Sequence, residues 1–407
     1  MQEDMGRSTT FGTWLKKFKW IQSSREQTLR AESRLLALSG CELPLKQKDT
    51  FIHNGKDFLH SIEGGIADGP PLVYLPGYGA GVGFFFRIIK GLCAGWHVYC
   101  VDLLGTGLSS RPKFSAKSTE EAENFFIDSL EEWRKARQLD TFILVGHSMG
   151  GYLAGCYARK HPDRVRHLVM VCPAGIGEKP KDWSPPDVVK SPWTMRGQLY
   201  RLATRLWNSG VTPGVFVRGI GPWGPKMVSG YTSRRFSVGH HLSDDEIDAF
   251  SEYMYGILSA KGSGEYALRH ILEPFAYPRS PLEYRLDTID VPISFIYGKQ
   301  DWMDPKAAQR LIQRIQNNRE KILEGDMDLN ATENAGHFPF LDQPGEFLRG
   351  MVSVCGSHLS EKGIQSVLEA ADEFPLEDSS AIDTKSQMQK EMKSNPAAAE
   401  AHIATDL

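Results

Sequence analysis

The chain has 407 residues, of which 41% are hydrophobic and 24% charged, a composition typical of a soluble globular protein. A formal net charge of −3 excludes a global positive field that would draw the protein to nucleic acid. Six cysteines occur without a Cys-x-x-Cys pair or metal-ligand spacing, so we expect reduced, mostly buried thiols and no metal. The length predicts one large domain with an insertion and tails.

Residues 1–50 are predicted to form an N-terminal extension. Its first ten residues lack the apolar region of a secretory signal, and Gln2 excludes N-myristoylation. Trp14, Phe18 and Trp20 alternate with lysines, a pattern that suits contact with a membrane interface and packing onto the domain equally well. No window reaches the ~18 apolar residues of a spanning helix, so we expect a cytoplasmic protein, soluble or peripheral to a membrane.

Residues 51–173 are predicted to form the first part of an α/β core. Continuous apolar runs of the kind that parallel sheets bury on both faces occur at 72–75, 98–101, 142–145 and 168–172. Helices are expected at 119–137, where acidic residues occupy the first turn, and at 151–160. This alternation predicts a mostly parallel, doubly wound sheet.

Residues 174–284 are rich in Pro, Gly and Trp and are predicted to form an inserted cap over the functional site. The tryptophans suit a lining for acyl chains and are Trp183, Trp193, Trp207 and Trp223. Arg218, Arg234 and Arg235 are candidates to hold a phosphate headgroup, although each also suits a solvated surface position.

The core is expected to resume at residues 285–356, beginning with a strand at 293–297 (ISFIY). Residues 357–407 are polar and acidic and end in SNPAAAEAHIATDL. Such a composition cannot bury enough apolar surface to offset the entropy of folding, so we expect a largely disordered tail.

The motif that carries the chemistry is Gly146-His147-Ser148-Met149-Gly150, which follows the strand at 142–145 and precedes a helix. This is the Gly-x-Ser-x-Gly elbow in its required strand-to-helix context. The tight turn needs small residues on either side, and it presents the serine at the positive end of a helix. We therefore expect Ser148 to be an exposed nucleophile, whereas His147 inside the elbow is expected to be structural.

A serine nucleophile needs a base, and the base needs a carboxylate to orient it. Asp301 lies just past the strand at 293–297, and His337 lies in a Gly-flanked loop further on. The chain order Ser, Asp, His is that of the nucleophile-elbow enzymes. Asp304 is the rival acid, and we favour Asp301 because it lies closer to the strand end.

The tetrahedral intermediate of acyl transfer needs backbone N–H donors. The N–H of Met149, directly after the nucleophile, is the first expected donor. The loop after residue 75 reads Pro76-Gly77-Tyr78-Gly79, and its glycines allow a close approach, so the N–H of Tyr78 is the second. A plain turn is the alternative for this loop.

A second glycine motif, Gly105-Thr106-Gly107, resembles part of a nucleotide-binding loop. The third glycine of the dinucleotide fingerprint is missing, and no helix is expected to start there. We therefore interpret it as a structural turn after a strand.

The motifs LVYLPGYG, DLLGTGLSSRP, GHSMGG, YGKQDWMD and GHFPFLD resemble the α/β-hydrolase superfamily. More narrowly, STEEAENFFIDSLEEWRKA, FVRGIGPWGP and GYTSRRF resemble its subfamily of N-acyl-phospholipid lysophospholipases, lipid-droplet lipase co-activators and their plant relatives. The resemblance runs from about Trp14 to about Cys355 and implies an α/β-hydrolase fold with a triad of Ser148, Asp301 and His337.

The resemblance also implies phospholipid or lysophospholipid substrates, membrane or lipid-droplet attachment through the Trp-rich N-terminus and, in some members, acylation of lysophosphatidic acid with acyl-CoA as co-substrate. Two departures are visible. Pro76 stands where the family usually has His, which alters the support of the oxyanion loop but leaves the donor in place. Ser148 is present, whereas some co-activators have lost the serine.

The acyltransferase activity of the subfamily is associated with a His-x-x-x-x-Asp motif, which here is His337 to Asp342. His337 is already the expected triad base, and Asp342 precedes Gln-Pro, as a helix cap does. A direct catalytic role for Asp342 and a structural one both remain open at this point.

The hypothesis from the sequence is a serine-dependent lipid acyl hydrolase or acyltransferase that needs no cofactor. An aspartate-nucleophile dehalogenase or epoxide hydrolase is disfavoured because serine occupies the elbow. The main alternative is a lipid-droplet docking protein that activates a partner lipase, and a small-ester or peptide hydrolase of the same fold is a third.

Overall fold

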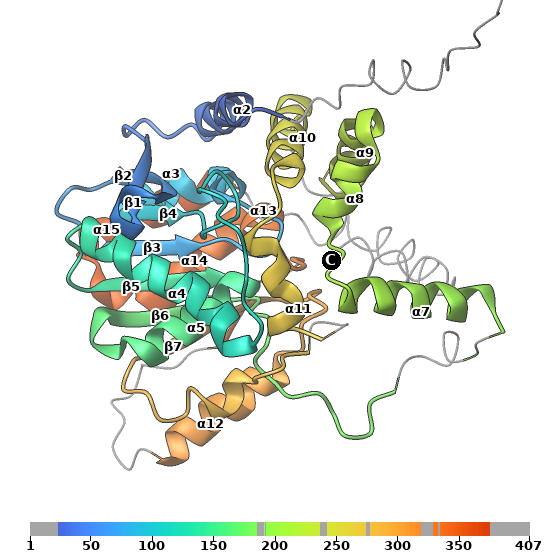
Figure 1. Cartoon of the computed structure of the whole chain (residues 1–407). Helices are drawn as coiled ribbons and strands as arrows, with labels where there is room; N and C mark the ends of the chain where they lie inside the picture. Colours follow the sequence, from blue (N-terminus) through green and yellow to red (C-terminus); the bar gives the residue numbers. More distant parts are fainter. Residues whose placement is uncertain are drawn as a thin grey trace, which may run out of the picture.

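A computed structural model describes residues 23–184, 191, 193–236, 242–273, 277–318, 329–332 and 334–374. Within them an eight-stranded sheet runs in the order β1-β2-β4-β3-β5-β6-β7-β8, with helices on both faces (Figure 1). The strands from β4 to β8 in this order pair in parallel, whereas β1 and β2 are antiparallel. The strands are β1 Lys46–Ile52, β2 Asp57–Gly65, β3 Pro71–Leu75, β4 His97–Val101, β5 Phe142–His147, β6 Val165–Val171, β7 Ile293–Gly298 and β8 Leu329–Thr332.

The five strands predicted from apolar runs are confirmed as β3 to β7, and nearly all of their residues are buried. The carboxyl ends of parallel strands lie at one edge of a sheet, so Pro76, Ser148 and Cys172, which directly follow β3, β5 and β6, are brought to the same edge. Strands β1, β2 and β8 were not predicted. Polar residues interrupt each of them, including His60, Ser61 and Glu63 in β2, so none forms a continuous apolar run.

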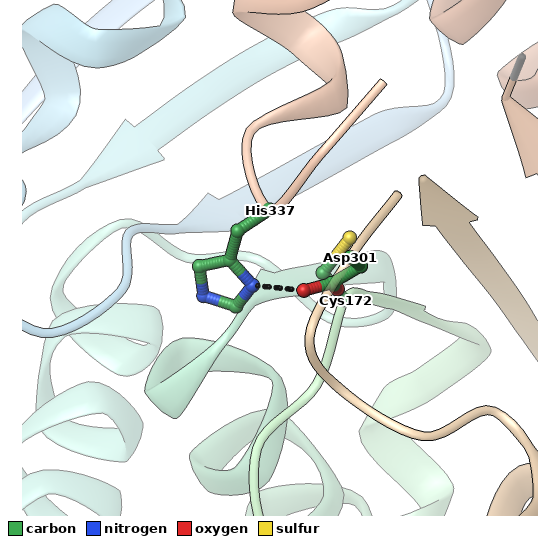
Figure 2. Close-up of side chains that lie close together, drawn as sticks. All are labelled: Cys172, Asp301 and His337. Carbon is green, nitrogen blue, oxygen red and sulfur yellow. Dashed lines mark hydrogen bonds and ion pairs between the residues drawn. The ribbon is translucent and has the colours of Figure 1, made fainter. Parts of the chain in front are cut away.

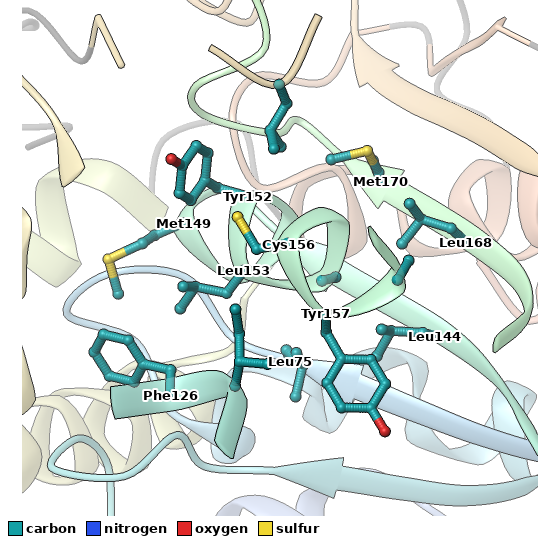
Figure 3. Close-up of a cluster of buried hydrophobic side chains, with 14 of the residues drawn as sticks. Leu75, Phe126, Leu144, Met149, Tyr152, Leu153, Cys156, Tyr157, Leu168 and Met170 are labelled. Carbon is teal, nitrogen blue, oxygen red and sulfur yellow. The ribbon is translucent and has the colours of Figure 1, made fainter. Parts of the chain in front are cut away.

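Helices cover both faces of the sheet. One apolar cluster joins the sheet to α4, α5 and α12, and a second joins it to α3, α14 and α15. Figure 3 shows part of the first cluster, in which Tyr152, Leu153 and Cys156 of α5 pack over strand residues such as Leu75 and Leu144. The core helices are α3 Phe86–Gly95, α4 Thr119–Ala136, α5 Met149–Lys160, α12 Lys306–Asn318, α13 Pro339–Asp342, α14 Pro344–Cys355 and α15 Glu361–Asp372.

The inserted cap is helical, as predicted, and lies between β6 and β7 in the chain, beside the sheet edge where the parallel strands end (Figure 1). Its helices are α7 Met195–Asn208, α8 Pro213–Gly219, α9 Gly224–Phe236, α10 Asp244–Ser259 and α11 Leu268–Ile271. Short 3-10 turns complete the described chain at η1 His53–Gly55, η2 Val82–Phe85, η3 Pro162–Arg164, η4 Gly221–Trp223, η5 Gly264–Ala267, η7 Leu282–Tyr284 and η8 Gly356–His358.

The N-terminal boundary predicted at residue 50 is too late, because the core already includes α2 (Arg25–Leu38) and β1. Ser24 and Gln27 form a capping box that starts α2, and Leu35 of this helix is fully buried. Strand β1 forms the outer edge of the sheet, where Lys46 and Lys48 are exposed. Only residues up to 22 lie outside the described structure at this end.

The tail predicted to be disordered from residue 357 contains a helix, α15, which Ser360 caps through the Gly363 N–H. Val367 and Ala371 of α15 are buried, and Val367 lies against Gly95 of α3. The overall composition of the tail is polar, but its few apolar residues at 361–372 recur at helical spacing and cover the sheet-side helices. Residues 375–407 lie outside the described structure.

Candidate active site

Ser148 forms the sharp turn between β5, which ends at His147, and α5, which begins at Met149. Its φ of 53° and ψ of −119° are rare for a residue other than glycine, and such strain is typical of functional turns. A Cβ at Gly146 would lie 2.4 Å from the Gly150 carbonyl oxygen, and one at Gly150 would lie 2.5 Å from the Pro76 carbonyl oxygen. The crowded elbow therefore requires glycine at both flanking positions.

Three predicted residues form one hydrogen-bonded chain. His337 Nε2 lies 3.0 Å from Ser148 Oγ, and His337 Nδ1 lies 3.0 Å from Asp301 Oδ1. Figure 2 shows the imidazole directed at the Asp301 carboxylate, although the two residues come from separate loops after β8 and β7. The side chains of His337 and Asp301 are buried, so the imidazole is held with little competition from water.

Asp304, the alternative candidate for the acid, contacts the start of a helix instead of His337. Its Oδ1 accepts a hydrogen bond of 2.9 Å from the Lys306 N–H at the start of α12. Asp301 Oδ1 also accepts a bond of 3.1 Å from the Met303 N–H, which fixes its carboxylate beside His337. The geometry thus assigns the position next to the imidazole to Asp301 and the helix start to Asp304.

Cys172 lies close to Asp301 and His337 (Figure 2), and this placement was not predicted from the sequence. Burial, and then the nearby Asp301 charge, raise the pKa of its thiol well above the ordinary range, so the thiol stays protonated. One ligand-type atom from each of Cys172, Asp301 and His337 lies within 4.8 Å of the others. Both ring nitrogens of His337 are already engaged, so this cluster suits proton transfer better than metal binding. No motif in the sequence marks Cys172, because only the pairing of β6 with β7 brings it beside Asp301.

His147 supports the loop that carries the His337 imidazole. Its Nε2 lies 2.7 Å from the backbone carbonyl oxygen of His337, and the ring is buried. Burial and the neighbouring His337 hold the His147 pKa well below its usual value, so the ring is neutral and Nε2–H donates. The structural role predicted for His147 agrees with this bond.

The two expected oxyanion donors lie on either side of the serine. Met149 is the first residue of α5, and a first-turn N–H has no acceptor within its own helix. A Cβ on Gly77 would lie 3.0 Å from Ser148 Cβ, so the loop after β3 passes directly beside the nucleophile. The Tyr78 side chain is not directed at the oxyanion position, because its hydroxyl lies near Thr212 and Glu265. Burial is the main cause that raises the pKa of this hydroxyl.

Residues 70–344 match the family model described as the alpha/beta hydrolase fold. The chain belongs to the α/β-hydrolase family. It is 38% identical over 370 residues to a rice protein named probable 1-acylglycerol-3-phosphate O-acyltransferase, with 86% of each chain covered. It is 36% identical over 295 residues to the mouse (lyso)-N-acylphosphatidylethanolamine lipase, covering 71% of this chain and 80% of the relative.

Solved structures show the same fold. A bacterial membrane phospholipase A superposes on this α/β hydrolase with a TM-score of 0.55 at 19% identity, covering 85% of this chain and 95% of that one. Together with the relatives, this likeness places the chain among α/β hydrolases whose named members include lipases and acyltransferases of lipid metabolism.

Asp342 of this α/β hydrolase is buried in α13 and braces the histidine loop. Its Oδ2 accepts a hydrogen bond of 2.8 Å from the Gly336 N–H and lies 3.4 Å from the Arg235 guanidinium of the cap. No described contact joins Asp342 to Ser148, whereas His337 contacts the serine directly. The geometry therefore favours the structural alternative for Asp342.

The three arginines proposed for a phosphate fall into different surroundings. Arg218 pairs with Glu265 and donates to the Ala260 carbonyl oxygen at 3.0 Å. Arg234 is exposed and donates to its own helix at Gly230. Arg235 lies with its guanidinium 5.9 Å from the ring of Phe338, the residue after His337.

The four tryptophans of the cap differ in how far they are buried. Trp207 is partly buried against the main apolar cluster, and Trp183 lies at 5.7 Å from the Tyr277 ring, whereas Trp193 and Trp223 are exposed. Trp193 and Trp223 therefore do not line an interior acyl site, contrary to the prediction made for all four tryptophans.

The motif Gly105-Thr106-Gly107 is a structural turn, as predicted. Asp102 at the end of β4 accepts the Val82 N–H at 2.9 Å and the Leu108 N–H at 2.7 Å. A Cβ on Gly107 would lie 2.1 Å from the Asp102 carboxylate, and φ of Gly107 is positive, so glycine is required there.

The predicted membrane contacts Trp14, Phe18 and Trp20 lie outside the described residues. Across the residues that the structure does describe, no helix combines the length and apolarity needed to cross a bilayer. All six cysteines are unpaired, and five of them are buried, as expected.

Proposed function

We propose that this α/β hydrolase transfers acyl groups from phospholipids or lysophospholipids through an acyl-Ser148 intermediate. The observation that carries the proposal is the chain Ser148–His337–Asp301, with both hydrogen bonds at 3.0 Å and the serine on a strained elbow. This arrangement is the one that turns a weak serine hydroxyl into a nucleophile at neutral pH.

In the first half-reaction, His337 Nε2 accepts the Ser148 proton as Oγ attacks the ester carbonyl. The N–H groups of Met149 and Tyr78 stabilise the resulting oxyanion, and Asp301 stabilises the imidazolium. Collapse of the tetrahedral intermediate breaks the ester bond, and His337 returns the proton to the departing alcohol. The products are acyl-Ser148 and a lysolipid or glycerophospho compound.

In the second half-reaction, His337 deprotonates the acceptor that attacks the acyl-serine. Water as acceptor releases a free fatty acid, whereas the hydroxyl of lysophosphatidic acid yields phosphatidic acid. When acyl-CoA is the donor, Ser148 attacks the thioester and free CoA leaves with the proton from His337. Hydrolysis and acyl transfer therefore use the same residues, and no cofactor beyond the acyl donor is needed.

Lipid substrates are supported by the printed names of the rice and mouse relatives, which are an acyltransferase of acylglycerol phosphate and a lipase of N-acylphosphatidylethanolamine. Arg235 is the favoured contact for a substrate phosphate because it lies beside the His337 loop. The enzyme works at the cytoplasmic surface of membranes or lipid droplets, to which Trp14, Phe18 and Trp20 contribute contacts.

The test is to incubate purified protein and its Ser148→Ala variant with labelled lysophosphatidic acid and phospholipid vesicles, with and without acyl-CoA, and to resolve the lipid products. Free fatty acid that depends on Ser148 is expected and would establish a hydrolase. Phosphatidic acid formed only with acyl-CoA would establish the acyltransferase. Absence of both products would favour the docking of a partner lipase instead.

A further inference from the structure

Helix α7 has an apolar face that points to solvent. Met195, Leu199, Leu202 and Leu206 are spaced by four, three and four residues, so they share one side of the helix. A globular protein normally buries such a face, yet Met195 is 78% exposed, Leu199 57% and Leu202 52%. Figure 1 shows α7 at the outer side of the cap, away from the sheet.

Arginines border this apolar face on both sides. At about 100° per residue, Arg201 and Arg205 flank it on one side and Arg196 on the other. All three side chains are exposed. An apolar stripe between two cationic margins is typical of a helix that lies in the plane of a membrane interface.

Exposed apolar side chains are also frequent elsewhere in the cap. Seven of the twelve exposed large hydrophobic residues of the described structure fall between positions 193 and 227. We call these seven the cap patch, and they are Trp193, Met195, Leu199, Leu202, Phe216, Trp223 and Met227. Four of the seven, from Trp193 to Leu202, lie on α7 or within two residues of its start, and an exposed apolar helix face of this kind marks an interaction surface.

Charge identifies the partner. Residues 193–236 contain seven Lys and Arg residues and no Asp or Glu, although the whole chain has a net charge of −3. Two of the seven, Arg218 and Arg235, pair with Glu265 and Asp342 from outside this segment. A cationic surface inside an anionic protein favours a partner with many negative groups beside an apolar layer. An anionic phospholipid surface offers both, and exposed tryptophans such as Trp193 and Trp223 are suited to its headgroup region.

We infer that the cap patch docks on anionic phospholipid membranes, with the apolar face of α7 in the acyl-headgroup boundary and its arginines on lipid phosphates. Docking here places the membrane beside α9, whose last turn carries Arg235 next to the histidine loop. The inference does not depend on the chemistry at Ser148.

The first experiment measures cosedimentation of the full chain with vesicles of phosphatidylcholine alone or with added phosphatidic acid. Strong binding only to the anionic vesicles is expected. The double variant Leu199→Gln with Leu202→Gln is expected to bind at least about tenfold more weakly, because it removes apolar contact with the lipid. The matched control is Phe51→Gln with Ile66→Gln. It removes two exposed apolar side chains that lie outside the cap, and it is expected to bind like the parent.

A second pair of variants tests the charge. Arg201→Gln with Arg205→Gln is expected to weaken binding to anionic vesicles about tenfold and to flatten its dependence on ionic strength. Lys113→Gln with Lys117→Gln removes the same charge from an exposed loop of the core and is expected to have little effect. Circular dichroism and hydrolysis of a soluble ester verify that every variant is folded.

Hydrogen exchange locates the contact independently of any variant, and residues 193–208 are expected to gain protection when anionic vesicles are added. Unchanged exchange there, or binding that Trp14→Ala with Trp20→Ala abolishes while the α7 variants bind normally, would overturn the inference. Protection of α7 by a protein partner but not by vesicles would overturn it too. Ser148→Ala is expected to bind vesicles fully, so failure of docking and failure of the acyl chemistry are separable.

Discussion

The Asp342 carboxylate accepts the backbone N–H of Gly336 at 2.8 Å, and the next residue in the chain is His337. The same buried carboxylate faces Arg235 at the end of the cap helix α9. Asp342 therefore joins two parts of the chain that are separate in sequence. It holds the loop that presents the imidazole, and it links this loop to the cap.

Asp342→Asn is expected to keep most of the activity, because an amide oxygen can still accept the Gly336 N–H. Asp342→Ala is expected to lower kcat about 10- to 100-fold and to destabilise the fold by about 3 kcal/mol, since it leaves Arg235 without this buried partner. Hydrolysis and acyl transfer, measured separately, should decline in parallel. Loss of acyl transfer alone would instead give Asp342 a direct role in that reaction.

Asp301→Asn is expected to lower kcat by about 10³- to 10⁴-fold, because the amide no longer stabilises the imidazolium of His337. Asp304→Asn is the matched control, and it should alter only the start of α12, at most by about 1 kcal/mol. Steady-state kinetics on a soluble ester would distinguish the two. Comparable losses in both variants would contradict the assignment of the acid.

The free energy of unfolding should depend on pH through His60. Burial alone would lower the pKa of His60, but its hydrogen bonds of 2.8 Å to Asp49 and Glu32 outweigh burial and raise the pKa to about 10. Because the folded state holds the proton more tightly than the unfolded chain, this stabilisation is complete below about pH 6.5 and is lost progressively as the pH rises to about 10.

Urea unfolding at pH 6 and at pH 9.5 tests this dependence. His60→Gln should be less stable than the parent at pH 6 and should lose most of the decline between the two pH values. His97→Gln, on the neighbouring strand β4, is the control and should retain the decline. A parent protein that is equally stable at both pH values would refute the assignment.

Helix α15 contributes to the fold although it lies in a polar segment. Val367→Asp should lower the free energy of unfolding by about 3 kcal/mol or more, because it places a charge against Gly95 in a fully buried position. Gln365→Asp, two residues earlier and exposed, should change it by about 0.5 kcal/mol or less. Thermal or urea denaturation would measure both, and equal effects would mean that α15 is not docked.

Ser148, Asp301 and His337 could be predicted from the sequence because each has a recognisable local sequence context. The glycines around Ser148 are required by the crowding of a single turn, and Asp301 follows a continuous apolar strand. Each position can therefore be recognised from the residues next to it in the sequence. The partner of Arg218 could not be predicted in this way. Glu265 lies 47 residues further along the chain, and only the folded cap brings the two together.

The elements missed from the sequence share a physical reason. Strand β2 buries His60 and Glu63, whose charges are satisfied by residues on other elements, so its sequence does not look apolar. Cys172 has no motif, and its relation to Asp301 arises only from the alignment of β6 with β7. Long-range pairing, rather than local propensity, decides such positions.

The exposed lysines at the outer edge of the sheet bear on how this protein behaves at high concentration. An unpaired edge strand invites a second molecule to extend the sheet, and the hazard is greatest when the strand is long, flat and apolar. If the β1 strands of two molecules paired, Lys46 and Lys48 of each copy would lie close to those of the other. Repulsion between these positive charges opposes an extension of the sheet from one molecule to the next. When no lipid is present, self-association should therefore proceed through the apolar cap, and detergent should reverse it.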